Sequence, residues 1–368
     1  MKFQINKKIF DEVLEIVSKY SDAISTFYGF RCVLIEVTDE KIILKTSNDS
    51  INIIKKIDVD DINVKVESTG KFLIQTNVIK PIIKKLSGNI DISTDNNQLL
   101  TISQGTSNYQ VSLVNENSFP AFDNIINVKE IKINTSKLKK AIKSVIHAAS
   151  LDNNLIYKCI NIRNKNDSLH FTTTDSYRLA LYQLKHNGLI TENVDISVVA
   201  KDLSSLIPID APEEITLFYN DIKVGIKYEN TVITSRVVTI PFKDTEPLFE
   251  NLNIKHSIQI EKTELNDLLN RVWLANGDKQ NRLSFAVKEG SLKITNNVVE
   301  VGSFVATTDK FKYSGDLIEF DLNYNFLKDA ISIFDGEISI LIDEKVGKFL
   351  IISHSDTGSK QLITPLRR

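Results

Sequence analysis

The side chains that most often carry enzyme chemistry are few and scattered along this 368-residue sequence. None of the five histidines is followed by another at H-x-x-x-H spacing, and the two cysteines form no C-x-x-C pair. Such spacings are the usual signature of protein zinc sites. The sequence therefore predicts no metal site and no cofactor.

Phosphate loops and nucleophile motifs are also missing from the sequence. Gly70-Lys71 and Gly347-Lys348 are each followed by phenylalanine, where a phosphate loop needs serine or threonine. No G-x-S-x-G nucleophile motif occurs. The acidic run at 58–61 could suggest a cation site, but a solvated loop is the simpler interpretation. We therefore expect a binding or structural protein rather than an enzyme.

The pattern that does recur is a short alternating strand followed by an amphipathic helix. The strand residues Ile5, Ile133 and Ile260 are 128 and 127 residues apart. Cys32 and Cys159 are also 127 residues apart, each opening a second strand. Alternation with period 2 predicts strands, and apolar residues at helical spacing predict one buried helix face. The chain therefore looks like three copies of one domain, which open at Met1–Tyr20, Ile131–Ser150 and Ser257–Asn276.

The same strand–helix theme repeats inside each copy, so each domain is expected to hold two half-repeats of one helix and about four strands. The inner halves begin at Phe72–Leu86, Ile196–Ile207 and Ile318–Phe334. Prolines close the three copies at Pro120, Pro241 and Pro365. We predict an α+β fold with three tandem domains at 1–126, 127–252 and 253–368, a size that suits ordinary domains.

Composition limits the partners and the compartment. The net charge of −2 excludes a globally basic protein, so contact with nucleic acid would need a local patch. Exposed helical lysines usually only solvate a surface, but their excess on equivalent helices suggests a basic surface for phosphates. Two cysteines in separate domains, with no signal peptide and no apolar run of about 20 residues, point to the cytoplasm and no membrane. The predicted DNA-facing residues are Lys80, Lys84, Lys137, Lys140, Lys143 and, more weakly, Arg271.

Four local motifs give the chain a resemblance to the bacterial DNA polymerase III beta subunit, the sliding clamp. They are the opening Met1-Lys2-Phe3, the central Thr174–Ala180, the run Leu292–Asn297 and the C-terminal Thr364–Arg367. The family's central motif usually reads T-D-G-H-R-L-A, so Ser176 and Tyr177 are departures. Its C-terminus usually reads M-P-M-R-L, whereas this chain ends in Arg368.

The resemblance implies a non-catalytic processivity factor of the DNA polymerase III holoenzyme. Clamps of this family are head-to-tail homodimers, in which twelve helices line a hole and the sheets form the outside. The ring encircles duplex DNA without reading its sequence, slides, and tethers the replicative polymerase. The implied partners are DNA, the polymerase, the clamp loader and other proteins with short clamp-binding motifs.

The resemblance also implies two protein contact sites. At the ring interface, Trp273 and Leu274, expected as an exposed apolar pair at a helix end, would meet Tyr109 and Val111 of the partner chain. A pocket between the second and third domains would bind the peptide motifs, with Arg178 and Asn323 orienting the peptide backbone. Its implied residues are Thr174, Ser176, Tyr177, Arg178, Leu179, Pro241, Asn323, Phe326, Val346, Leu362, Ile363, Thr364, Pro365, Leu366 and Arg367.

Two other classes of function compete with a clamp. One is a three-repeat scaffold that binds proteins without encircling DNA. The other is a nucleic-acid enzyme, which the missing metal and nucleophile signals disfavour. Solution mass, together with retention on nicked circular against linear DNA, separates a clamp from a scaffold.

Overall fold

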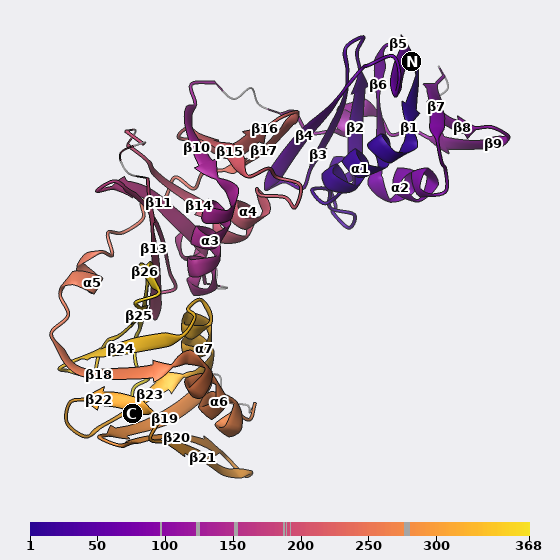
Figure 1. Ribbon diagram of the computed structural model, residues 1–368. Helices are drawn as coiled ribbons and strands as arrows, with labels where there is room; N and C mark the ends of the chain where they lie inside the picture. Colours follow the sequence, from indigo (N-terminus) through magenta and orange to yellow (C-terminus); the bar gives the residue numbers. More distant parts are fainter. Residues whose placement is uncertain are drawn as a thin grey trace. The chain divides into compact units, whose positions relative to one another are not determined.

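The computed structural model of the chain describes residues 1–95, 98–122, 126–150, 154–186, 188, 190–191, 193–275 and 280–368 (Figure 1). The chain divides into two compact units. The first comprises Met1–Thr135 with Ser205–Val237, and the second Ser136–Ser204 with Val238–Arg368.

The first unit contains a five-stranded sheet in the order β5-β1-β7-β8-β9 and an eight-stranded sheet in the order β10-β15-β16-β17-β4-β3-β2-β6. Helices α1 and α2 lie side by side (Figure 1). The elements are β1 (Lys2–Asn6), α1 (Lys7–Ser18), β2 (Cys32–Val37), β3 (Lys41–Ser47), β4 (Ile51–Asp58), β5 (Val64–Ser68), β6 (Gly70–Gln75), α2 (Thr76–Lys84), β7 (Asn89–Thr94), β8 (Leu99–Gln104), β9 (Ser107–Ser112), β10 (Lys129–Asn134), β15 (Glu214–Tyr219), β16 (Lys223–Tyr228) and β17 (Thr231–Arg236).

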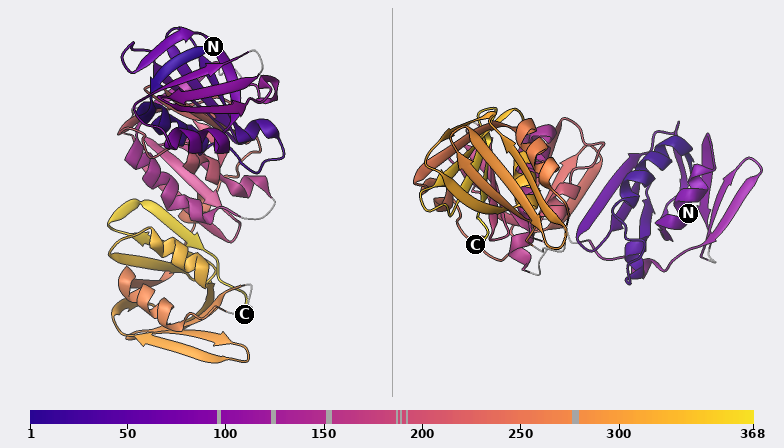
Figure 2. Two further views of the ribbon diagram at one scale, coloured as in Figure 1. Left: turned by 90° about the vertical axis from the view of Figure 1, so that its right-hand side faces the viewer. Right: turned by 90° about the horizontal axis from the view of Figure 1, so that it is seen from below.

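The second unit contains a nine-stranded sheet in the order β14-β11-β12-β13-β26-β25-β24-β18-β22 and a four-stranded sheet in the order β21-β20-β19-β23. Helices α6 and α7 lie side by side (Figure 2). The elements are α3 (Thr135–Val145), β11 (Cys159–Lys165), β12 (Ser168–Thr174), β13 (Arg178–Lys185), β14 (Asp195–Val199), α4 (Ala200–Ser205), α5 (Pro247–Glu250), β18 (Ile254–Glu261), α6 (Lys262–Val272), β19 (Arg282–Lys288), β20 (Ser291–Val298), β21 (Gly302–Thr308), β22 (Phe311–Ser314), β23 (Ile318–Asn323), α7 (Tyr324–Ser332), β24 (Glu337–Asp343), β25 (Phe349–Ser353) and β26 (Asp356–Ile363).

The predicted half-repeats are present, and their strands are exchanged. The strand before each repeated helix pairs with the strands that follow the other repeated helix of the same domain. In the first domain β1 pairs with β7 and β6 pairs with β2. In the third domain β18 pairs with β24 and β23 pairs with β19. Each helix buries its apolar stripe, as Phe10, Val13, Leu14 and Val17 of α1 illustrate.

The two cysteines confirm that the copies correspond residue by residue. Cys32 opens β2 and Cys159 opens β11, and both side chains are buried. Each thiol donates to the carbonyl oxygen four residues earlier, Tyr28 at 3.4 Å and Leu155 at 3.2 Å. Burial raises the pKa of Cys32 to about 11 and that of Cys159 to about 12, so both thiols stay protonated at neutral pH.

The last strands of the half-repeats join successive domains. β4 pairs with β17 antiparallel, with Ile53 opposite Ile233. β13 pairs with β26 in the same way, with Leu179 opposite Leu362. The two remaining last strands are β9 and β21, which within the described residues pair only with β8 and β20. Among the described residues, β9 and β21 are therefore the two last strands that keep an unpaired edge, and they correspond by the repeat.

Two helix ends differ from the sequence prediction. Helix α6 ends at Val272, so Trp273 is its C-cap, and Asn276 lies outside the described residues. After α3 the chain tightens into a 3₁₀ turn at Ile146–Ala148. Continued helical spacing would place His147 on the face of Lys140 and Lys143, but the tighter turn carries it inward, where Nε2 lies 3.0 Å from the Gln361 Oε1 atom.

His147 makes stability depend on pH. Burial lowers its pKa to about 4, and the charge of Arg178 acts in the same direction. An unfolded histidine titrates near 6.5, so the unfolded chain binds more protons between these values. The contribution of the neutral His147 to the free energy of unfolding is therefore complete above pH 6.5 and is lost as the pH falls towards 4. We expect the free energy of unfolding of His147→Gln to change less between pH 7 and 5 than that of the parent protein, by up to about 2 kcal/mol. Urea titrations at both pH values measure this, and identical pH slopes for the variant and the parent would contradict it.

Candidate peptide groove, sheet edges and helix surfaces

The β12–β13 turn is fixed by its own side chains. Thr174 Oγ1 donates to the Arg178 carbonyl at 2.7 Å and accepts from the Ser176 amide at 3.1 Å. Asp175 Oδ1 accepts from the amides of Tyr177 and Arg178 at 3.0 and 2.9 Å. Ser176 has a φ of 75°, a conformation that favours glycine. The serine therefore keeps the turn that the glycine of the related motif allows, and the Tyr177 side chain projects from it into solvent.

The C-terminal run lies against this turn. The amide and hydroxyl of Thr364 both donate to the Tyr177 carbonyl, at 3.0 and 2.9 Å. Two residues later the Leu366 amide donates to the Asp321 carbonyl at 2.8 Å. The structure thus brings together the central motif and the C-terminal motif, as predicted.

Arg178 and Asn323 are held by their own chain. Arg178 Nε lies 2.9 Å from Asp175 Oδ2, its Nη1 lies 2.7 Å from Asp329 Oδ2, and its guanidinium lies over the Phe326 ring at 4.4 Å. Asn323 was predicted to orient a peptide, and each end of its buried amide already makes one hydrogen bond within the chain. Its Oδ1 accepts from the Phe326 amide at 3.1 Å and caps α7, and its Nδ2 donates to the Gln280 carbonyl at 2.7 Å.

An apolar row, the floor of the predicted groove, crosses three paired strands. Leu179 lies opposite Leu362, which lies opposite Leu350, and all three belong to one apolar cluster. Ile363 was predicted in the groove, but successive side chains of a strand face opposite sides, and it packs into the main core of the third domain. Of the remaining predicted residues, Pro241 and Arg367 are exposed, and Val346 and Pro365 are partly buried.

Sequence reasoning missed Leu350 and Phe249 as members of this cluster. Leu350 could have been found from strand alternation once its partner strand was known. Phe249 lies in the connector between the second and third domains, where no periodic pattern marks a buried residue.

The first joint offers a direct comparison with the second. The row that corresponds to Leu179, Leu362 and Leu350 reads Asn52, Thr234 and Gly225 in the eight-stranded sheet. Asn52 and Thr234 line a cavity of about 170 Å³, together with Arg236 and several other polar side chains. Within the described residues, the apolar floor is therefore a feature of the second joint and is not repeated at the first.

The open strands β9 and β21 both carry apolar side chains. Tyr109 and Val111 are partly buried on β9, as are Phe304 and Ala306 on β21, while Val305 is exposed. Sequence reasoning did not single out Phe304 and Ala306 as side chains of an open last strand, although the position of β21 in the repeat could have indicated them. These side chains lie on the two last strands of half-repeats that lack a second partner strand among the described residues.

The apolar pair after α6 is not uniformly exposed. Trp273 stacks on Tyr324 with ring centroids 4.0 Å apart and an interplanar angle of 3°, and it packs against the core of its own domain. Trp273 is therefore only partly exposed, which corrects the prediction that both members of the pair are exposed. Leu274 remains 41% exposed.

Half of the predicted DNA-facing cations already have carboxylate partners. Lys80 and Lys84 of α2 both pair with Glu15 of α1, at 2.9 and 2.5 Å. Lys140 pairs with Asp356 at 2.9 Å. Lys137, Lys143 and Arg271 are exposed, and the last two form no ion pair within the described part of the chain. The cationic charge that is open to a ligand is therefore smaller than the count of lysines suggests.

Family models for the DNA polymerase III beta subunit match nearly the whole chain. The N-terminal-domain model covers residues 1–123, the central-domain model 132–244 and the C-terminal-domain model 252–367. No helix among the described residues is long and apolar enough to cross a membrane.

Curated relatives and solved structures agree with these models. The beta sliding clamp of Mycoplasmopsis pulmonis is 30% identical, and that of Bacillus subtilis 25%, with each chain covered completely. The crystal structure of the Bacillus subtilis sliding clamp matches with a TM-score of 0.92, covering 100% of this chain and 99% of the other at 25% identity. The Pseudomonas aeruginosa beta subunit, at 18% identity, gives the same TM-score over both whole chains.

A chain with three such domains over its whole length is a clamp-type accessory subunit rather than a polymerase. The protein belongs to the bacterial DNA polymerase III beta subunit family, the beta sliding clamps. Its function is that of a non-catalytic processivity clamp in DNA replication.

Proposed function

We propose that two copies of this chain close head to tail into a ring that encircles duplex DNA and holds the replicative polymerase on it. The observation that carries this proposal is the pair of open last strands, β9 and β21. Four of the six last strands pair within the chain, as β4 with β17 and β13 with β26. The two left over belong to the first and third domains, and in this proposal each completes a joint with another copy.

Symmetry explains why two copies suffice. A contact between unlike surfaces of identical chains closes into a ring when the rotation returns to its start. Two β9–β21 joints between copies would complete six equivalent joints, four within the chains and two between them. Pairing also protects open edges that otherwise invite aggregation. In this proposal the domains are 1–126, 127–252 and 253–368, the helices line the hole and the sheets face outward.

A ring needs little affinity for DNA, because release requires the ring to open. Phosphate contacts from a few exposed cations, direct or through water, are enough to centre the duplex without reading its sequence. This agrees with a net charge of −2 and with the ion pairs that already engage Lys80, Lys84 and Lys140.

The groove at the second joint is the proposed docking site for the polymerase, the clamp loader and other proteins with short apolar motifs. An apolar floor of three leucines, bordered by Tyr177 and the C-terminal run, has the character of a ligand groove. Tyr177, in place of the smaller histidine of the related motif, narrows the entrance. Like other replication proteins, the ring would work in the cytoplasm.

Primer extension tests this function directly. With the cognate polymerase, loader and ATP on a long primed circle, adding the protein should lengthen the products made in one binding event. Products of unchanged length at saturating protein would contradict the proposal.

The cations of the inner surface should affect loading and not assembly. We expect the double change Lys143→Glu and Arg271→Glu to weaken loading on nicked circular DNA about tenfold at moderate salt, because repulsion replaces attraction to phosphate. Lys140 is avoided because reversing it would place two carboxylates together at Asp356. The matched control is Lys288→Glu with Lys293→Glu, the same charge change on exposed strand positions. Equal loading of both double variants, measured by gel filtration with labelled DNA, would contradict the basic-surface proposal.

A further inference from the structure

The floor of the proposed groove is covered by its own chain. Leu179, Leu362 and Leu350 are only 3%, 5% and 8% exposed, and the cluster that buries them includes Phe249 of α5. Phe249 itself is 9% exposed. The leucines are therefore covered within this cluster, and Phe249 is its one aromatic member among the described residues.

The segment that carries Phe249 is a short connector with little structure of its own. It runs from the end of β17 to the start of β18 and contains α5, a single turn of four residues. Within that turn the Phe249 and Glu250 amides donate to the Glu246 carbonyl at 2.9 and 3.3 Å. One helical turn is not stable alone, so α5 depends on the contacts that hold it to the sheet.

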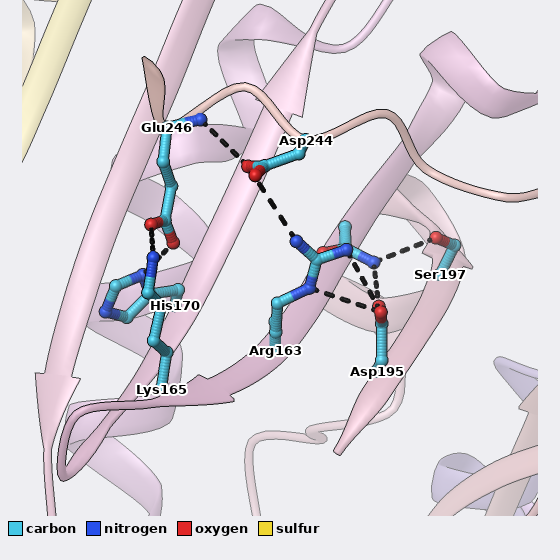
Figure 3. A network of polar contacts seen from close by, with 8 residues as sticks. Arg163, Lys165, His170, Asp195, Ser197, Asp244 and Glu246 are labelled. Carbon is cyan, nitrogen blue, oxygen red and sulfur yellow. Dashed lines mark hydrogen bonds and ion pairs between the residues drawn. The ribbon is translucent and has the colours of Figure 1, made fainter. Parts of the chain in front are cut away.

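Those contacts are a polar network around Glu246, shown in Figure 3. The Glu246 carboxylate pairs with Lys165 and with His170 Nδ1 at 3.0 Å, both on the neighbouring strands β11 and β12. Burial alone would raise the pKa of Glu246. The contacts with Lys165 and His170 together lower it by more, so the pKa of Glu246 lies below its usual value. The Glu246 amide donates to Asp244 Oδ1 at 3.1 Å, and Asp244 lies 3.9 Å from Arg163. Lys165, Arg163 and Asp244 are partly exposed, and ion pairs with such members are weak and easily exchanged for water, whereas the His170–Glu246 contact is largely buried.

We propose that α5 is a strap over the groove, and that partner peptides bind by replacing the Phe249 ring with a large apolar side chain of their own. This inference rests on the proposed peptide-binding function of the groove. The ring shows what the floor accepts, an anchor of about the size of leucine or phenylalanine. Because only molecules with the strap displaced can bind, the strap lowers the apparent affinity by the fraction displaced.

The first test compares peptide affinities. A fluorescein-labelled peptide copied from the apolar clamp-binding segment of the replicative polymerase is titrated against the full-length dimer, with anisotropy as the readout. Phe249→Ala should bind it about tenfold more tightly. Glu246→Gln, which weakens the polar network around residue 246 and keeps the Phe249 ring, should show a smaller gain in affinity. Leu248→Ala is the matched control, because Leu248 lies on the same turn and is exposed.

The outcomes distinguish a failure of the strap proposal from a failure of the proposed peptide-binding function. If the parent protein binds the peptide and Phe249→Ala binds equally or more weakly, Phe249 is a wall of the site and the strap proposal fails. If neither protein binds the peptide, the peptide-binding function itself fails. Thermal unfolding of each variant shows whether the fold survives the substitution.

Hydrogen exchange on the unmodified dimer gives a second, independent test. Peptide binding normally slows the exchange of the amides that it covers. A displaced strap would behave in the opposite way, so the amides of residues 248–250 should exchange faster in the complex than in the free protein. Slower exchange of these amides in the complex would overturn the proposal.

Discussion

The Leu274→Asp variant is expected to be a monomer at concentrations at which the parent protein is a dimer. Leu274 is 41% exposed in one chain, whereas its neighbour Trp273 already stacks within its own domain. In a closed ring Leu274 would be buried against the β9 edge of the partner, near the partner's Tyr109 and Val111. Burying an unpaired carboxylate costs several kcal/mol, and about 3 kcal/mol weakens dimerisation more than a hundredfold.

Sedimentation velocity across a concentration series measures the change. The Asn296 side chain donates to the carbonyls of Val272 and Leu274 at 3.1 and 3.3 Å, so the backbone after α6 should hold its conformation in the variant. Leu317→Asp is the control, because Leu317 is exposed just before β23, which lies at the opposite end of the four-stranded sheet from β21. A dimer of unchanged strength in Leu274→Asp would remove Leu274 from the interface.

Loss of the C-terminal run should abolish peptide binding and leave the ring assembled. Deleting Thr364–Arg368 removes the two hydrogen bonds to the Tyr177 carbonyl and the bond from the Leu366 amide to the Asp321 carbonyl. Neither open edge includes these residues, so the dimer should persist. We expect the affinity for a polymerase-derived peptide to fall at least a hundredfold.

The deletion also removes two ion pairs, which requires a control. Arg368 pairs with Glu319 at 3.0 Å and with the buried Asp321 at 3.2 Å, while Arg282 pairs with Asp321 at 2.6 Å. Arg368→Ala therefore loses both ion pairs and keeps the other residues of the proposed groove, and it should bind the peptide normally. Calorimetry that finds full affinity in the truncated protein would refute the groove as the binding site.

The repeat made most of the fold predictable, because it rests on local signals. Strand alternation and helical stripes recur at fixed spacing, and the strands that open at Cys32 and Cys159 were placed correctly. The exchange of strands between half-repeats was not predictable in the same way. Alternation shows which face of a strand is buried, not which strand lies beside it.

The site residues show the same division between local and tertiary information. The meeting of the central motif with the C-terminal run followed from the family resemblance. The partners of Asn323, Trp273 and Lys140 come from elements far away in the sequence, and no spacing reveals them. The burial of Phe249 with the groove leucines was not predictable for a related reason, because Phe249 is one apolar residue in an irregular connector.

The central claim is that the chain encloses DNA topologically, and retention on circular against linear DNA tests it most directly. The protein is loaded on nicked circular plasmid with loader and ATP, separated from free protein by gel filtration, and then treated with a single-cutting nuclease. A closed sliding ring stays with the circle through the column and is lost within minutes of linearisation, because it runs off the ends. Equal retention on circular and linear DNA, or none on either, would contradict a ring that encircles the duplex.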